Sequence, residues 1–153
     1  MILNHDFVKY PELTNKQLGE FETLSPHEQI KEDFQAEVVE VQDGDTITVR
    51  TNFRDFAFPV RFLEINAPEM SQGGQEAREW LRSRILGQRV EIQIDEFNRV
   101  GKYGRLLGRV IFQGFDMGLE MLYLGLVMPY GMSDPLGLPN LKEQFNIKKW
   151  LPA

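Results

Sequence analysis

The sequence contains no cysteine, so it has neither disulfides nor thiolate ligands for a metal. A bound metal ion would need oxygen ligands or the two histidines, His5 and His27, and oxygen ligands favour calcium or magnesium. Long apolar runs are also missing, since none approaches the roughly 18 residues of a membrane span. The first residues lack the basic and apolar regions of a secretory signal. We therefore expect a cytoplasmic chain with no membrane partner.

Positive charge is scarce as well. The chain of 153 residues has 17 Lys and Arg against 23 Asp and Glu, a net charge of −6. This argues mildly against a protein that coats nucleic acid nonspecifically. Much of the acidity lies in residues 1–34, which hold seven acids and three bases. An apolar content of 42% and an aromatic content of 11% are sufficient for one folded domain with a core.

Residues 1–34 have too few apolar side chains for a core of their own, and we expect them to form an N-terminal arm. Two helix starts occur there, at 14–17 and at 25–28. The second is the stronger, because Ser25 can cap the helix, Pro26 suits its first position and Glu28 follows three residues after the cap. The pattern predicts a short helix near 26–34. The arm either packs on the domain or reaches to a partner.

Residues 35–133 have the pattern of a small β domain. Alternating apolar residues predict a hairpin closed by Asp43 and Gly44, and a later strand interrupted by Pro59. The five predicted strands cover 36–41, 46–51, 56–65, 89–95 and 105–112. Five short strands with added helices favour a small closed or partly open barrel, of which the OB-fold is the commonest nucleotide-binding type.

Two helices complete this mainly β, α+β domain. Apolar spacing predicts one helix over 75–86, ended by Gly87, and another over 117–124, ended by Gly125. Residues 134–153 are broken by proline and glycine, and we expect a C-terminal extension with at most a short helix over 140–150. The predicted fold is thus a five-stranded OB-type barrel with two domain helices and an arm.

Charged residues with a chemical role are expected in three segments. Asp43 and Asp45 flank a turn, which an Asp-Gly pair ordinarily marks, but two carboxylates at one end of a barrel can also hold a divalent cation. Arg61 is expected to face inward from an apolar strand. It would then need a structural ion pair with Glu64 or a loop acid, or else a bound phosphate.

Glu69 and Arg105 allow similar pairs of interpretations. Glu69 could be a loop acid or a first-turn carboxylate of the next helix, or it could take a proton from an attacking water. Arg105 could be a surface charge, or a second guanidinium for the charge that a phosphodiester develops during transfer. Taken together, these residues predict a metal-assisted phosphodiesterase site.

Three motifs in order, DGDT at 43–46, VRFLEINAPE at 60–69 and KYGR at 102–105, resemble the staphylococcal-nuclease-like (thermonuclease) family over roughly residues 36–131. The resemblance implies an OB-type barrel and calcium-dependent cleavage of DNA and RNA. It also implies calcium ligands at Asp45, Asn66 and the Ala67 carbonyl. In the same comparison Glu69 would be the general base and Arg61 and Arg105 the phosphate ligands, while Lys102, Tyr103 and Tyr130 would contact the substrate.

The chain departs from the family at Asn66, where aspartate is usual. An amide keeps an oxygen ligand but removes one negative charge, so we expect weaker calcium binding, partly compensated by Asp43. Gly101 replaces a common acid that we regard as structural. Both ends also differ from the family pattern, which suggests that they dock on a protein partner or on further copies of this chain in a homo-oligomer, within a larger assembly such as a cellular complex or a viral particle.

Two functions follow from the sequence. The first is a metal-dependent nuclease of low sequence specificity acting on DNA, RNA or both. The alternative is a nuclease-like domain retained as a structural or binding module with weak or no catalysis. A single-stranded nucleic-acid-binding barrel without catalysis is less well supported, because no stripe of basic and stacking aromatic residues is present.

Overall fold

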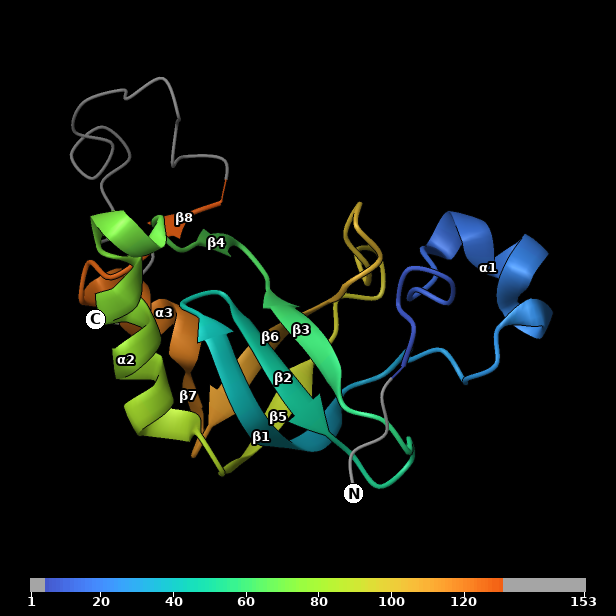
Figure 1. Ribbon diagram of the computed structural model, residues 1–153, viewed down its shortest axis with the longest axis horizontal. Helices are drawn as coiled ribbons and strands as arrows, with labels where there is room; N and C mark the ends of the chain where they lie inside the picture. Colours follow the sequence, from blue (N-terminus) through green and yellow to red (C-terminus); the bar gives the residue numbers. More distant parts are fainter. Residues whose placement is uncertain (1–4, 131–153) are drawn as a thin grey trace.

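A computed structural model of the protein describes residues 5–130 (Figure 1). Neighbouring strands pair in the order β3-β2-β1-β5-β6, and a parallel pairing of β3 with β6 closes them into a five-stranded barrel. The predicted OB-type α+β fold is confirmed. The barrel strands are β1 (Phe34–Asp43), β2 (Thr46–Arg50), β3 (Phe58–Phe62), β5 (Arg89–Gln93) and β6 (Leu106–Phe112).

Short strands extend this barrel at two places. Strand β7 (Phe115–Asp116) pairs with β6, while β4 (Ile65–Asn66) and β8 (Met128–Pro129) form a separate two-stranded sheet. The predicted strand over 56–65 is therefore divided into β3 and β4. Pro59 lies within β3 opposite Thr48, and pairing with β6 begins only at Val60. An imide nitrogen without a hydrogen is tolerated there because that side of the strand is not yet paired.

The core lies inside the barrel because the strands alternate buried and half-buried positions. Strand β6 shows the alternation over all seven residues. Strand β1 has two register shifts, one between Val38 and Glu40 and one between Val41 and Asp43. Such bulges bend a strand and increase its twist. The second bulge directly precedes the turn that carries Asp43, so it sets the direction of that turn.

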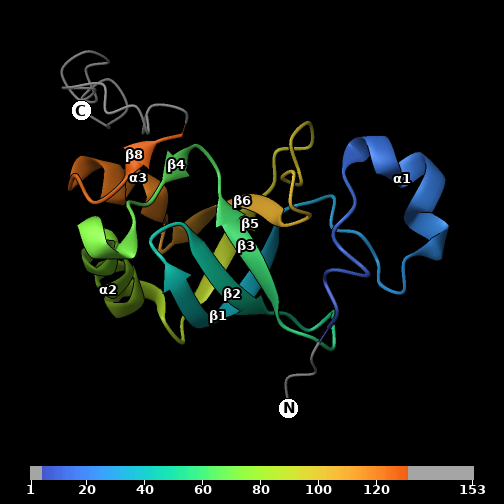
Figure 2. The same cartoon turned by 45° about the horizontal axis from the view of Figure 1, so that its top comes forward.

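Two helices lie together at one end of the barrel, on the left in Figures 1 and 2. Helix α2 (Gly74–Ile85) buries Ala77, Leu81 and Ile85, and helix α3 (Met117–Tyr123) follows β7. An ion pair of 3.2 Å between Arg84 of α2 and Glu120 of α3 joins them. Both predicted domain helices are confirmed.

The arm contains a helix, but in a different place from the predicted one. Helix α1 (Asn15–Phe21) has a capping box from Thr14 and Gln17, and the 3-10 turn η1 (Glu22–Leu24) follows it. Residues 26–33 form no helix, so the prediction of a helix near 26–34 is wrong. The reason is tertiary, because the carbonyls of Glu28 and Ile30 accept hydrogen bonds from two arginines of the barrel.

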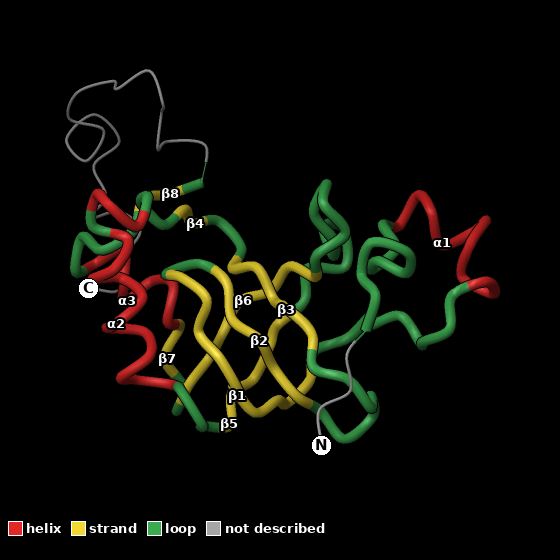
Figure 3. Tube along the Cα trace, in the orientation of Figure 1, coloured by secondary structure: helices red, strands yellow, loops and turns green. Residues whose placement is uncertain are grey.

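The described part of the arm, residues 5–33, packs against the barrel on the side opposite α2 and α3 (Figure 3). His5 stacks on Phe56 with ring centroids 4.0 Å apart, and His27 contacts both rings edge-on. The predicted C-terminal extension and its short helix lie outside the described residues. Over residues 5–130, no helix is long and apolar enough to cross a membrane.

Candidate active site

Arg61 lies on the outer side of β3, between two core residues. Val60 and Phe62 are buried and Arg61 alternates with them. The prediction that Arg61 faces inward is wrong, because the two-residue period of a strand places it opposite its apolar neighbours. Its side chain is nevertheless only 12% exposed. The guanidinium is therefore shielded by what lies outside the barrel.

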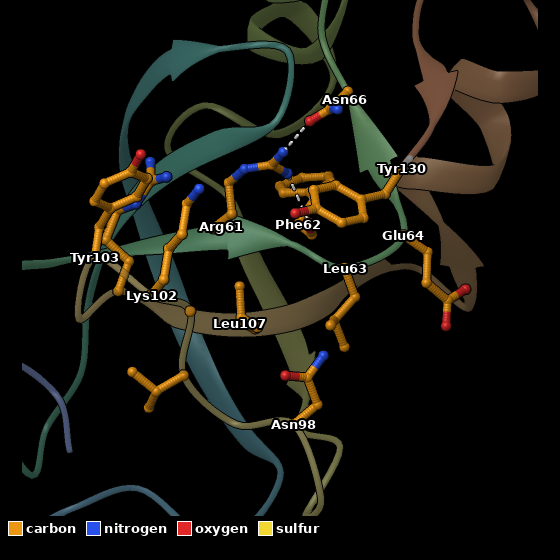
Figure 4. Close-up of a pocket in the computed structure, with 13 residues that line it drawn as sticks. Arg61, Phe62, Leu63, Glu64, Asn66, Asn98, Lys102, Tyr103, Leu107 and Tyr130 are labelled. Atoms are coloured by element: carbon orange, nitrogen blue, oxygen red, sulfur yellow. Dashed lines mark hydrogen bonds between the residues drawn. The ribbon is translucent and has the colours of Figure 1, made fainter. Parts of the chain in front are cut away.

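The turn after β3 provides that shielding. Glu64 has a φ of 68°, a left-handed conformation, and lies in the turn between β3 and β4. One guanidinium nitrogen of Arg61 consequently donates to the carbonyls of Phe62 and Ile65, at 2.8 and 2.9 Å. The other donates to the side-chain oxygen of Asn66 (Figure 4). Arg61 is thus held in place by its own strand and the turn that follows it.

Asp45 joins the hairpin turn to the segment after β4. One oxygen of its carboxylate accepts the amide hydrogen of Ala67 at 2.7 Å and lies 3.4 Å from a guanidinium nitrogen of Arg61. Of the two structural partners considered for Arg61, the loop acid is the one observed. Glu64 instead pairs with Arg109. The structure therefore brings Asp45, Asn66, Ala67 and Arg61 together.

Asp43 lies next to Asp45, and the two carboxylates influence each other. The amide of Asp45 donates to an oxygen of Asp43 at 3.0 Å. Burial, together with the neighbouring Asp45 carboxylate, raises the pKa of Asp43 to about 6. A cation beside Asp43 would favour the ionised form of this carboxyl, so positive charge would be stabilised at this end of the barrel.

The candidate metal ligands at this end of the barrel are all oxygen atoms, and calcium prefers oxygen ligands. Within residues 5–130, however, no group of three or more His, Cys, Asp or Glu side chains could hold a metal ion. A cation here would rest on the Asp45 carboxylate, with the amide oxygen of Asn66 and the Ala67 carbonyl as neutral ligands and the Asp43 carboxylate adding attraction from beside them. These oxygen ligands suit a hard cation such as calcium, but they carry little negative charge to bind it.

Lys102, Tyr103 and Arg105 lie on the loop between β5 and β6. Gly104 has a φ of 75° and Gly101 accepts its amide hydrogen, so the loop makes a tight turn. The Tyr103 side chain is 73% exposed, with the Lys102 amine 5.0 Å and the Arg105 guanidinium 5.9 Å from its ring centroid. Neither cation forms an ion pair with any residue between 5 and 130.

A pocket of about 520 Å³ lies between β3, this loop and the end of β8. Tyr130 is 65% exposed, and its ring centroid lies 6.0 Å from the Arg61 guanidinium carbon. Figure 4 shows Tyr130 and Asn66 beside Arg61, with Lys102 and Tyr103 on the facing loop. Six of the nine predicted site residues line the pocket, namely Arg61, Asn66, Lys102, Tyr103, Arg105 and Tyr130.

The other three predicted residues lie behind or beside the pocket. Asp45 adjoins it through the Arg61 ion pair, and Ala67 through its bond to Asp45. Glu69 does not line it, and its side chain is exposed two residues past Ala67, just before the 3-10 turn η2 (Met70–Gln72). The Glu69 carbonyl accepts the amide hydrogen of Gly74 at 2.9 Å, which ties this segment to α2.

Two buried arginines that hold the arm were not predicted from the sequence. Arg54, from the loop between β2 and β3, forms a two-pronged ion pair with Glu12, and Arg99 donates to carbonyls of the arm. Both are under 9% exposed. The only sequence signal was that Arg54 lies between two phenylalanines, Phe53 and Phe56, in a polar loop.

An OB-type barrel whose end presents two arginines, adjacent carboxylates and exposed tyrosines is a fold and a site suited to nucleic-acid phosphates. The chain belongs to the staphylococcal nuclease homologues, whose family model matches residues 59–145. This match includes eight of the nine predicted site residues. Asp45, in the DGDT motif, lies upstream of it.

Several relatives are named as nucleases. A probable endonuclease of Colletotrichum graminicola is 37% identical over 94 residues, covering 54% of this chain and 33% of the relative. Micrococcal nuclease of Shigella flexneri is 44% identical over 79 residues, covering 51% and 42%. An uncharacterized endonuclease of Escherichia coli O157:H7 is 31% identical over 121 residues, covering 76% and 75%. The chain thus spans less than half the length of the first two relatives.

Proposed function

We propose that this chain is a metal-dependent endonuclease that hydrolyses phosphodiester bonds of DNA, RNA or both with low sequence specificity. The observation that carries the proposal is the placement of Arg61 and Arg105 on one pocket, beside the Asp45 carboxylate. Guanidinium groups bind phosphate oxygens through paired, directional hydrogen bonds. Membership of the staphylococcal nuclease homologues supports the same activity.

Arg61 and Arg105 would have different roles in catalysis. Arg61 already donates to two carbonyls and to Asn66, so its position is fixed and fewer of its hydrogens remain for a ligand. Arg105 is half-buried and has no ion pair within residues 5–130, so the N–H groups of its guanidinium are available to a phosphate. We assign placement of the phosphate to Arg61 and most of the charge stabilisation in the transition state to Arg105.

Glu69 would take the proton of the attacking water. Its exposed carboxylate lies just past Ala67, on a segment held by α2, and a carboxylate near a water can act as a general base. Calcium bound at Asp45, Asn66 and the Ala67 carbonyl would supply positive charge to the phosphoryl group and acidify a water. Tyr103, Tyr130 and Lys102 would hold the bases and the backbone of a single strand.

Cleavage of denatured DNA and of RNA by the purified chain, in calcium and in chelator, tests the proposal. Glu69→Gln and Arg105→Ala should each lower the rate by at least a hundredfold, the usual effect of removing a catalytic base or a charge-stabilising donor. Arg50→Ala, which removes an exposed arginine paired with Glu37 on β1, is the matched control and should keep full activity. Equal rates in all variants would refute the assignment.

A second function is favoured by one observation, the shortage of negative charge at the cation site. With Asn66 in place of the usual aspartate, and with no group of three or more His, Cys, Asp or Glu side chains within residues 5–130 that could hold a metal ion, the domain could bind nucleic acid without cutting it. Retention of a labelled single-stranded oligonucleotide, uncut over hours in millimolar calcium, would support this binding module. Turnover of the same oligonucleotide would support the enzyme.

A further inference from the structure

We propose that the N-terminal arm supports the site from outside the pocket, and that Pro11 and Glu12 are positioning residues for the loop of residues 96–105. The inference rests on the proposed function, since this loop carries Lys102, Tyr103 and Arg105. It adds an element that none of the three motifs contains. The arm and the loop are joined by several hydrogen bonds and one close packing contact.

The arm first contacts the loop at Gly104, the residue between Tyr103 and Arg105. The amide of Glu12 donates to the carbonyl of Gly104 at 3.0 Å. Pro11 packs so closely on Gly104 that a Cβ there would lie 2.6 Å from the Pro11 Cβ. Gly104 is flanked by Tyr103 and Arg105, so a shift of the arm would move both.

The second contact holds the base of the loop. The buried guanidinium of Arg99 donates to the Leu13 carbonyl at 3.0 Å and to the Asn15 side-chain oxygen at 3.1 Å, both in the arm. It also donates to the Ile30 carbonyl. The Asn15 amide group in turn donates to the Glu96 carbonyl at 2.7 Å. The loop is therefore bound to the arm at its base and at its tip.

The arm itself is firmly anchored at the same point. Both oxygens of Glu12 accept hydrogen bonds of 2.8 Å from Arg54, and both side chains are 2% exposed. The Leu13 amide donates to Gln29 at 2.8 Å. A buried two-pronged ion pair is costly to break. The residue whose backbone holds Gly104 is thus fixed to the barrel by its own side chain.

The arm does not line the 520 Å³ pocket, so it would act only through the loop. If the loop loosens, Arg105 is displaced and kcat falls, and fewer molecules present Lys102 and Tyr103 correctly, so the apparent affinity for substrate falls by that fraction. A raised KM is therefore expected. Loss of folded protein alone would instead lower kcat at an unchanged KM, so the two effects can be separated.

The test uses Glu12→Gln and Asn15→Ala in the full chain. Glu22→Gln is the matched control, because it makes the same chemical change in the arm but removes an exposed pair with Lys31 and only a longer-range attraction to Arg99. We expect KM for single-stranded DNA to rise about tenfold in both test variants and to stay unchanged in the control. Hydrogen exchange should be at least tenfold faster at the amides of Gly101 and Gly104.

Asn15→Ala keeps the test decisive if Glu12→Gln fails to fold, because Asn15 lies on the surface. Unchanged exchange in the loop, or a fall in kcat with KM unaltered, would overturn the proposal. If the wild-type chain cut nothing, the proposed function would fail separately. The exchange rates and the affinity for an uncut oligonucleotide would then decide the role of the arm, and no change in either would refute it.

Discussion

Asn66 lies at the centre of the site's charge balance. Its side-chain oxygen accepts a hydrogen bond from Arg61, which also lies 3.4 Å from Asp45. One guanidinium thus faces one carboxylate and one neutral amide. An aspartate at this position would offer a cation a second charged oxygen at the same place. The strength of metal binding should therefore depend strongly on this residue.

Asn66→Asp should lower the calcium concentration for half-maximal cleavage by roughly tenfold, since each added carboxylate strengthens an oxygen-ligand site. The matched control is Asn98→Asp, which adds the same charge to the lining of the same pocket but on the opposite loop. Calcium titration of the cleavage rate measures both. Equal gains from the two changes would show a general field effect and would count against Asn66 as a ligand position.

Glu12 provides a second residue-scale prediction, this time for stability. Burial raises the pKa of Glu12, but hydrogen bonds from His27 and Arg54 outweigh burial and lower the pKa from 4.5 to about 2. A carboxyl whose pKa is lowered by folding stabilises the fold above its unfolded pKa. That contribution is lost as the pH falls from 4.5 towards 2.

The stabilising contribution of the ionised Glu12 should be about 3 kcal/mol at neutral pH. Glu12→Gln should therefore destabilise the protein most above pH 4.5, and the difference from wild type should shrink towards pH 2, where Glu12 is half protonated. Urea unfolding at a series of pH values measures this. The exposed Glu22→Gln control should stay within about 0.5 kcal/mol throughout. A difference for Glu12→Gln that does not vary with pH would contradict the account.

At the scale of elements, the start of helix α2 sets the position of the Glu69 segment. A Cβ on Gly74 would lie 2.3 Å from the Pro68 carbonyl oxygen and 2.7 Å from that of Glu69. These are backbone atoms, so relief requires the segment to move. Glycine at the first position of α2 therefore permits the close packing that carries Glu69.

Gly74→Ala should destabilise the fold by about 1–3 kcal/mol, although alanine favours helix, because the collision outweighs helix propensity. It should also lower kcat, since Glu69 is displaced. Gly19→Ala in α1 is the control, because nothing lies within 4 Å of a Cβ there. It should be neutral or stabilise by up to about 1 kcal/mol. Chemical unfolding and cleavage rates test both, and equal stability of the two variants would refute the explanation.

Elements differed in how well the sequence predicted them. The hairpin at Asp43 and Gly44 and the two domain helices were predicted because alternation, helical spacing and terminal glycines are local signals. The helix near 26–34 was not, although its start had a good cap. The carbonyls of Glu28 and Ile30 accept hydrogen bonds from Arg54 and Arg99, and no local pattern reports a contact with residues so far along the chain.

For the whole molecule, the order of the three motifs predicted well which residues come together. The local sequence pattern predicted less well how their side chains are oriented and bonded. Six predicted residues share one pocket. The orientation of Arg61 was predicted wrongly, because its bonds depend on the left-handed turn at Glu64. The support of the loop by Pro11 and Glu12 was also unforeseen, since it depends on how the arm packs on the barrel.

The central claim, that this chain is a metal-dependent nuclease, is tested most directly by the rate at which the full chain cleaves single-stranded DNA as free calcium is varied. The account predicts no cleavage in chelator, a rate that rises with calcium, and full recovery when calcium is restored. Because the site has few negative charges, saturation should need high calcium concentrations. Intact DNA at millimolar calcium, or an equal rate in chelator, would contradict the account.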